Sequence, residues 1–202
     1  REKKRRNNLL VFQFSNCHNL SHREFFLLYN KSNYKIIMTP EQEYCHLFER
    51  MFELCDEQGW GDPGSYARSR EIYMAIKFGH QVATTYSGAD AFDGDIPLEY
   101  KSTIAKTINA TYNGISVQDT LEEQEKYIIE DKIGKYPYHY YARFDTGKIV
   151  EAWKLTGERV LDILLPKIKT QYPKKKNSNA KDPRIGVTVS QKEIKGNGER
   201  IR

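Results

Sequence analysis

The stretch SGADAFDGDIPLEYK at residues 87–101 carries the pattern that decides the fold expected of this chain. It predicts a tight turn at residues 93–95 followed directly by a strand. Successive side chains of a strand point to opposite faces of a sheet, so Glu99 and Lys101 share one face. Because the turn reverses the chain, we expect Asp90 to return beside Glu99.

Two carboxylates brought close together repel each other unless a cation lies between them. Carboxylate oxygens suit a hard divalent cation, so we expect Asp90 and Glu99 to bind Mg²⁺, with Mn²⁺ able to substitute. Such a metal lowers the pKa of a bound water and polarises a phosphate. Lys101, on the same face, can orient the attacking water or stabilise negative charge on the phosphate. The pattern therefore predicts a catalytic site of Asp90, Glu99 and Lys101.

This spacing, an Asp followed by Glu-X-Lys on the next strand, resembles the catalytic motif of the PD-(D/E)XK (restriction-endonuclease-like) nuclease superfamily. The resemblance covers roughly residues 65–117. It implies that Asp90 and Glu99 hold the metal and that Lys101 assists the water. Ala89 stands where the first motif of the family has a proline.

Glu71 is a candidate for a third metal ligand. It shares one face of a predicted helix with apolar residues, and a carboxylate in such a place is costly unless it is paired or coordinating. Many members of the superfamily place a helix Glu before the Asp strand as a further ligand, and Glu71 resembles that residue. The alternative is an ion pair with Arg68 or Arg70.

A purely structural interpretation of the motif also exists. Asp90, Asp93 and Asp95 would then be turn formers, and Glu99 with Lys101 would be a solvated strand face. If the turn runs differently, Asp93 or Asp95 would replace Asp90 as the ligand.

Hydrophobic periodicity and turn signals predict an α/β (α+β) fold of the restriction-endonuclease-like kind, in which helices flank a mixed central sheet. The predicted elements are helices at 40–57 and 65–78, strands at 80–85, 96–103 and 109–117, a helix at 120–133, a hairpin of 138–144 and 148–155, a helix at 156–168 and a strand at 184–189.

The 202 residues suggest one domain with extensions. We expect a basic, poorly ordered extension at 1–37, a nuclease core at 38–172, and a basic linker with a C-terminal strand and tail at 173–202. The first boundary depends on a helix start in which Thr39 and Gln42 form a capping box around Pro40.

Charge along the chain is uneven. Residues 1–37 carry eight Lys or Arg against two Asp or Glu, and residues 167–202 carry eleven against three, whereas the middle is acidic. Basic ends suit DNA as a partner, although such tails are often only solubilising. An odd number of cysteines and no long apolar run favour an intracellular protein without a membrane span.

The resulting expectation is a Mg²⁺-dependent DNA endonuclease that hydrolyses phosphodiester bonds, of a size that suits a type II restriction-like homodimer. The alternatives are a structure-selective nuclease acting at junctions or in repair or replication, a non-catalytic DNA-binding module on the same fold, and an interaction protein without a nucleic-acid role.

Overall fold

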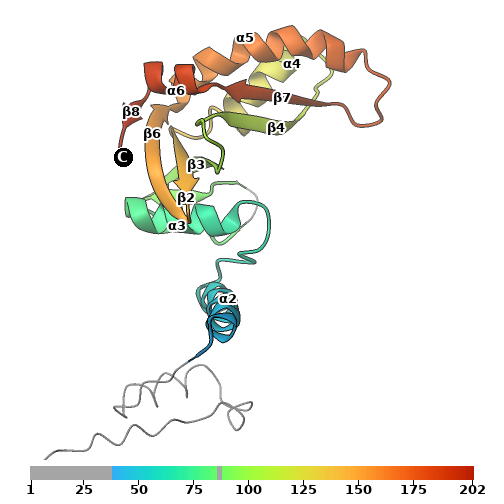
Figure 1. The fold of residues 1–202 in the computed structure, drawn as a ribbon. Coiled ribbons are helices and arrows are strands. Elements are labelled where there is room, and N and C mark those ends of the chain that lie inside the picture. Colours follow the sequence, from blue (N-terminus) through green and yellow to red (C-terminus); the bar gives the residue numbers. More distant parts are fainter. Residues whose placement is uncertain (1–37, 86–87) are drawn as a thin grey trace, which may run out of the picture. The chain divides into compact units, whose positions relative to one another are not determined.

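The computed structural model describes residues 38–85 and 88–202 (Figure 1). They fall into two compact units, one ending at Gln58 and one beginning at Gly59, and each is described by itself. The extension expected at 1–37 lies outside the described residues.

In the first unit, helix α2 (Pro40–Gln58) begins with the predicted capping box. The Thr39 amide donates to Gln42 Oε1 at 2.9 Å, and the Gln42 amide donates to Thr39 Oγ1 at 3.3 Å. The predicted helix start is therefore confirmed.

The second unit holds the remaining elements. They are α3 (Arg68–Phe78), β1 (Gln81–Val82), β2 (Ala91–Asp93), β3 (Ile96–Thr103), β4 (Ala110–Ser116), α4 (Leu121–Lys126), the π-helix η2 (Tyr127–Lys132), β5 (Tyr138–Asp145), β6 (Lys148–Thr156), α5 (Gly157–Lys176), β7 (Arg184–Val189), α6 (Gln191–Asn197) and β8 (Glu199–Arg200).

Six of these strands form one sheet in the order β1-β2-β3-β5-β6-β8. The β3–β5 pair is parallel and the other pairs are antiparallel, so the sheet is mixed. The predicted α+β class with a mixed sheet is confirmed. The strand predicted at 109–117 forms as β4, but it pairs with β7 in a separate two-stranded sheet.

The six-stranded sheet is covered on both faces. On one face α3 packs through Tyr73 against Phe144, with ring centroids 5.6 Å apart, and Arg70 Nε donates to Ser102 Oγ at 2.8 Å. On the other face Tyr141 belongs to a buried cluster contributed by β4, η2, α5, β7 and α6. The result is a three-layer arrangement with the β4–β7 pair in one outer layer.

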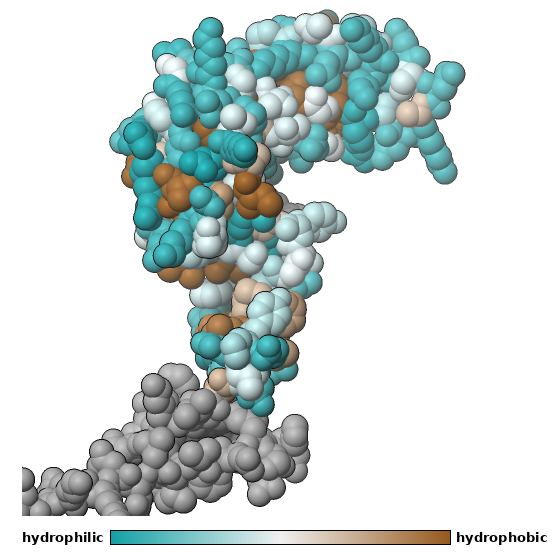
Figure 2. Space-filling view, in the orientation of Figure 1, coloured by the Kyte–Doolittle hydropathy of each residue, from teal (hydrophilic) through white to brown (hydrophobic). Residues whose placement is uncertain are grey.

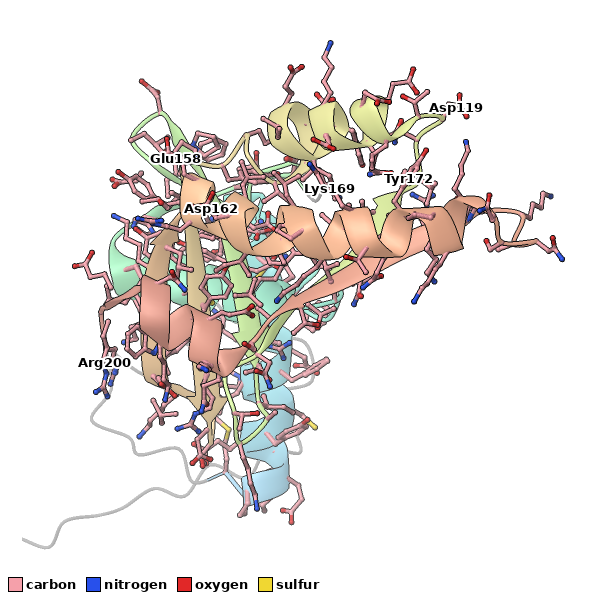
Figure 3. The ribbon with its side chains drawn as sticks, turned by 90° about the horizontal axis from the view of Figure 1, so that it is seen from above. Asp119, Glu158, Asp162, Lys169, Tyr172 and Arg200 are labelled. Carbon is pink, nitrogen blue, oxygen red and sulfur yellow. The ribbon has the colours of Figure 1, made fainter. Side chains whose placement is uncertain are left out.

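The C-terminal third is more structured than the sequence suggests. Helix α5 continues to Lys176, beyond the predicted end at residue 168. Its last turns are held because Tyr172 is buried and its hydroxyl donates to the carbonyl of Asp119 at 3.0 Å, a pair that Figure 3 shows beside α5. Helix α6 was not predicted, although Ser190 and Glu193 form a capping box at its start.

Candidate active site

Asp90 is fixed against β3 by two hydrogen bonds. Its amide donates to the carbonyl of Leu98 at 2.9 Å, and its Oδ2 accepts from the amide of Tyr100 at 2.7 Å. The chain reverses through the β2–β3 turn, in which Ala91 pairs with Leu98. Asp90 therefore lies beside the middle of β3, where the sequence places it.

Glu99 and Lys101 lie on the same face of β3 and form an ion pair. Both are partly buried, with 15% and 26% of their side chains exposed. Because β3 is parallel to β5, His139 lies beside Glu99 and Tyr141 beside Lys101. The structural interpretation of the motif requires a freely solvated strand face. The burial of Glu99 and Lys101 shows that this face is not freely solvated.

Glu71 reaches the same region from α3. It lines a cavity of about 300 Å³ together with Asp90. It also contacts Arg68, whose Nη1 is 3.5 Å from Glu71 Oε2. Arg70 instead donates to Ser102. Glu71 therefore pairs with Arg68 and shares a cavity with Asp90, and its role as a metal ligand stays a prediction.

The other two aspartates of the motif lie elsewhere. Asp93 ends β2 and Asp95 lies in the following turn, and both are exposed. Asp93 acts electrostatically on His80 and Tyr100, on the opposite side of β3 from Glu99. Asp93 pairs with Ile96 at the first residue of β3, whereas the Asp90 carboxylate is hydrogen-bonded at the middle of that strand, beside Glu99.

The electrostatics of the site leave its carboxylates under-compensated. Burial raises the pKa of Asp90 to about 7, and the charges of Glu99 and Glu71 add to this shift against the opposing effect of Lys101. Burial alone would lower the pKa of Lys101, but Glu99, Asp90 and Glu71 outweigh it and raise that pKa. The charge of Asp90 is therefore repelled by Glu99 and Glu71, while Glu99 pairs with Lys101 and Glu71 with Arg68.

The donor set has the chemistry of a hard-cation site. Within residues 38–85 and 88–202, no three His, Cys, Asp or Glu side chains form a ready-made metal cluster. Mg²⁺ commonly uses only one or two carboxylates and completes its shell with water and substrate phosphate, so Asp90 and Glu99 are the residues that could hold it. A cation here would relieve the repulsion that raises the pKa of Asp90.

A buried network beneath Lys101 was not foreseen from the sequence. Burial lowers the pKa of His139 to about 4, so its ring is neutral at pH 7. Its Nε2 donates to the carbonyl of Ile133 at 3.2 Å, which leaves Nδ1 to accept from the Tyr112 hydroxyl at 2.8 Å. The Tyr141 hydroxyl then donates to Tyr112 Oη, also at 2.8 Å.

This network fixes the ring on which Lys101 lies. Lys101 Nζ is 5.0 Å from the centroid of Tyr112, within the range of a cation–π contact. Four aromatic side chains of β5 are buried: His139, Tyr140, Tyr141 and Phe144. The pairing that brings Tyr112 to them is long-range, so no local signal reveals it.

Neither the comparison with family models nor the comparison with curated proteins finds a match for this chain. No helix in the described part of the chain combines the length and apolar character that crossing a bilayer requires.

Proposed function

We propose that this protein is a Mg²⁺-dependent endodeoxyribonuclease of the PD-(D/E)XK type, with a restriction-endonuclease-like fold. One observation carries the proposal: the Asp90 carboxylate is hydrogen-bonded to the β3 backbone at Tyr100, between Glu99 and Lys101, which form an ion pair. A preceding helix, a hairpin and further strands and helices surround the motif in the order expected from the sequence.

In this proposal Asp90 and Glu99 hold the cation, and Glu71 supports it from α3. When bound, the cation would polarise the scissile phosphate and make a water more acidic. Asp90 must lose its proton to serve as a ligand, and its pKa of about 7 places that loss at neutral pH. The buried setting that makes its charge costly also favours occupancy by a cation.

Lys101 is the residue that meets the reacting phosphate. Its raised pKa keeps it charged at neutral pH. Its ammonium is held between Glu99 and the Tyr112 ring, so little rotamer freedom remains to be lost when substrate binds. A fixed ammonium of this kind stabilises the negative charge that develops on a phosphate oxygen.

The substrate of this proposal is DNA, and a homodimer would let each subunit cut one strand. The test is incubation of supercoiled plasmid with the full chain in Mg²⁺, Mn²⁺ or EDTA. We expect nicked and linear products only with Mg²⁺ or Mn²⁺. Glu99→Gln should remove them, whereas Lys148→Ala, an exposed change at the start of β6, should not.

Branched and single-stranded DNA belong in the same assay, because they identify a structure-selective nuclease. If no substrate is cleaved with metal but DNA is still bound, the protein is a non-catalytic DNA-binding module on this fold and not an enzyme.

A further inference from the structure

The two-stranded ribbon of β4 and β7 has two chemically different faces. Its inner residues are all at most 6% exposed and belong to the buried cluster with α5: Ala110, Tyr112, Ile115, Ile185, Val187 and Val189. Its outer residues are polar or glycine: Thr111, Asn113, Gly114, Arg184, Gly186 and Thr188. Figure 1 shows the two strands side by side under α5, extending away from the six-stranded sheet.

The outer face is shaped by a β-bulge. The register shifts between Tyr112 and Ile115, and Gly114 has a φ of 69°, which favours glycine. The bulge sets the Asn113 amide over Gly186, where an added Cβ would meet Asn113 Oδ1 at 2.8 Å. The glycines at 114 and 186 thus leave room for the exposed Asn113 side chain, which lies across the ribbon over Gly186.

Hydrogen-bonding groups fill the rest of the face. The hydroxyls of Thr111 and Thr188 are 3.0 Å apart across the strands. Arg184 bonds to Ser116 on the partner strand and, at 2.8 Å, to Asp182. Such exposed ion pairs contribute little to stability, so the guanidinium can exchange Asp182 for another acceptor. Donors and acceptors are present here without a bulky apolar side chain.

Positive charge gathers at the outer end of the ribbon. Residues 174–184 contain one acidic side chain, Asp182, and five basic ones: Lys174, Lys175, Lys176, Lys181 and Arg184. Figure 2 shows a strongly hydrophilic surface over the outer end of α5 and the segment after it. A polyanion is the partner that this charge complements.

We infer that the outer face of the β4–β7 ribbon enters the major groove of duplex DNA, where Asn113 and Arg184 contact base edges. The inference rests on the proposed function for its choice of DNA. The major groove of duplex DNA is wide enough to admit a two-stranded ribbon. In that groove, Asn side chains pair with adenine and Arg side chains with guanine. Lys174, Lys175 and Lys181 then contact flanking phosphates.

Other occupants fit this face less well. The major groove of duplex RNA is too deep and narrow for a ribbon. Protein interfaces depend on aromatic or aliphatic anchors, which the outer face lacks. Duplex DNA is therefore the occupant that its chemistry selects.

The ribbon also begins at the candidate active site, because its inner residue Tyr112 contacts Lys101. Its strands have seven and six residues. At about 3.3 Å per residue the ribbon spans roughly 20 Å, or about six base pairs at 3.4 Å each. The bases that it contacts should lie within that distance of the cut.

The test selects binders from a pool of random DNA duplexes without metal, with duplex RNA as a second arm. The full chain should enrich a common DNA sequence and bind it at least tenfold more tightly than a scrambled duplex. Asn113→Ala and Arg184→Ala should each lose most of that preference. Lys175→Ala should weaken both duplexes alike and reduce the salt slope by about one, while Lys148→Ala should change neither.

The result is separable from the fate of the nuclease proposal, because no metal and no cleavage are involved. Glu99→Gln should retain the sequence preference if the ribbon sets it. Unchanged preference in both the Asn113 and Arg184 variants would overturn the inference even if plasmid is cut, as would tighter binding of RNA or no binding of any duplex. If these variants lose the sequence preference but the parent protein cuts no DNA, the inference about the ribbon stands and the nuclease proposal fails. The unfolding temperature of each variant is measured to detect misfolding. Thr188→Val, which preserves the shape of a side chain on the same face, serves as the second variant.

Discussion

The two faces of β3 treat their polar groups in opposite ways. On the Tyr100 face, the Tyr100 hydroxyl lies 2.6 Å from His80 Nδ1, and the ring of Tyr140 packs edge-on against Tyr100. Burial is the main cause that lowers the pKa of His80, while the charge of Asp93 opposes this shift and that of Lys154 adds to it. On the Glu99 face, one lysine meets mutually repelling carboxylates, and the pKa of Asp90 rises to about 7.

The difference separates packing from function. On the Tyr100 face, the Tyr100 hydroxyl and His80 Nδ1 are hydrogen-bond partners within the protein. On the Glu99 face, burial and neighbouring carboxylates strongly raise the pKa of Asp90, and such perturbed groups gather at functional sites. Changing matched residues on the two faces should therefore have unequal effects.

The largest contrast is expected between Lys101 and Tyr100. Lys101→Met removes a fixed cation from the reacting phosphate, and we expect the cleavage rate to fall by roughly 10²–10³. Tyr100→Phe on the other face should change the rate by only a few fold. Single-turnover cleavage of plasmid measures both rates. Equal losses of rate in the two variants would show that the two faces of β3 do not differ in function.

The pH dependence of cleavage should follow Asp90. Below pH 7 its carboxyl is protonated and is a poor ligand, so the rate should rise about tenfold per pH unit towards an apparent pKa near 7 and then level off. Higher Mg²⁺ should move this midpoint to lower pH, because the cation competes with the proton. A profile that is flat between pH 5 and 8 at low Mg²⁺ would contradict the assignment.

Glu71 should have a smaller effect on the same face. Glu71→Gln keeps the shape of the side chain and removes a charge that raises the pKa of Asp90. We expect a rate loss of about tenfold and a higher Mg²⁺ requirement, with Ser69→Ala, an exposed neighbour on α3, as the control. Normal cleavage accompanied by a lower unfolding temperature would reduce Glu71 to the structural partner of Arg68.

The smallest effect concerns stability without metal. The folded-state pKa of Asp90 exceeds its ordinary value of 3.8, so the folded protein binds a proton more tightly than the unfolded chain. Stability should therefore decline as pH rises from about 4 through 7. In EDTA at pH 8, Asp90→Asn should raise the free energy of unfolding by roughly 1–3 kcal/mol, which is seen as a higher unfolding temperature. The gain should be smaller at pH 5. Destabilisation at pH 8 would mean that the carboxylate is already compensated.

Local signals predicted much of this molecule. The Thr39 capping box, the left-handed Gly79 that ends α3, and the bounds of β3 all depend on nearby residues. The placement of Asp90 beside β3 follows from one turn. These features are short-range, and alternation and turn chemistry are sufficient to anticipate them.

Long-range pairing is what the sequence left open. The parallel β3–β5 pair sets His139 beside Glu99 across 40 positions, and β4 leaves the central sheet to pair with β7. Both depend on which buried faces fit together, because several strands share the same apolar alternation. The support of Lys101 by Tyr112, and the outer face of the ribbon, follow from these pairings.

The central claim is that the Glu99 face of β3 binds a divalent cation, and titration of the metal-free protein with Mn²⁺ tests it most directly. Free Mn²⁺, followed by its electron paramagnetic resonance signal, should be taken up by the parent protein and by His80→Phe on the opposite face. Glu99→Gln and Asp90→Asn should lose at least tenfold in affinity. Equal Mn²⁺ uptake by all four proteins, or none by the parent with and without DNA, would contradict the account.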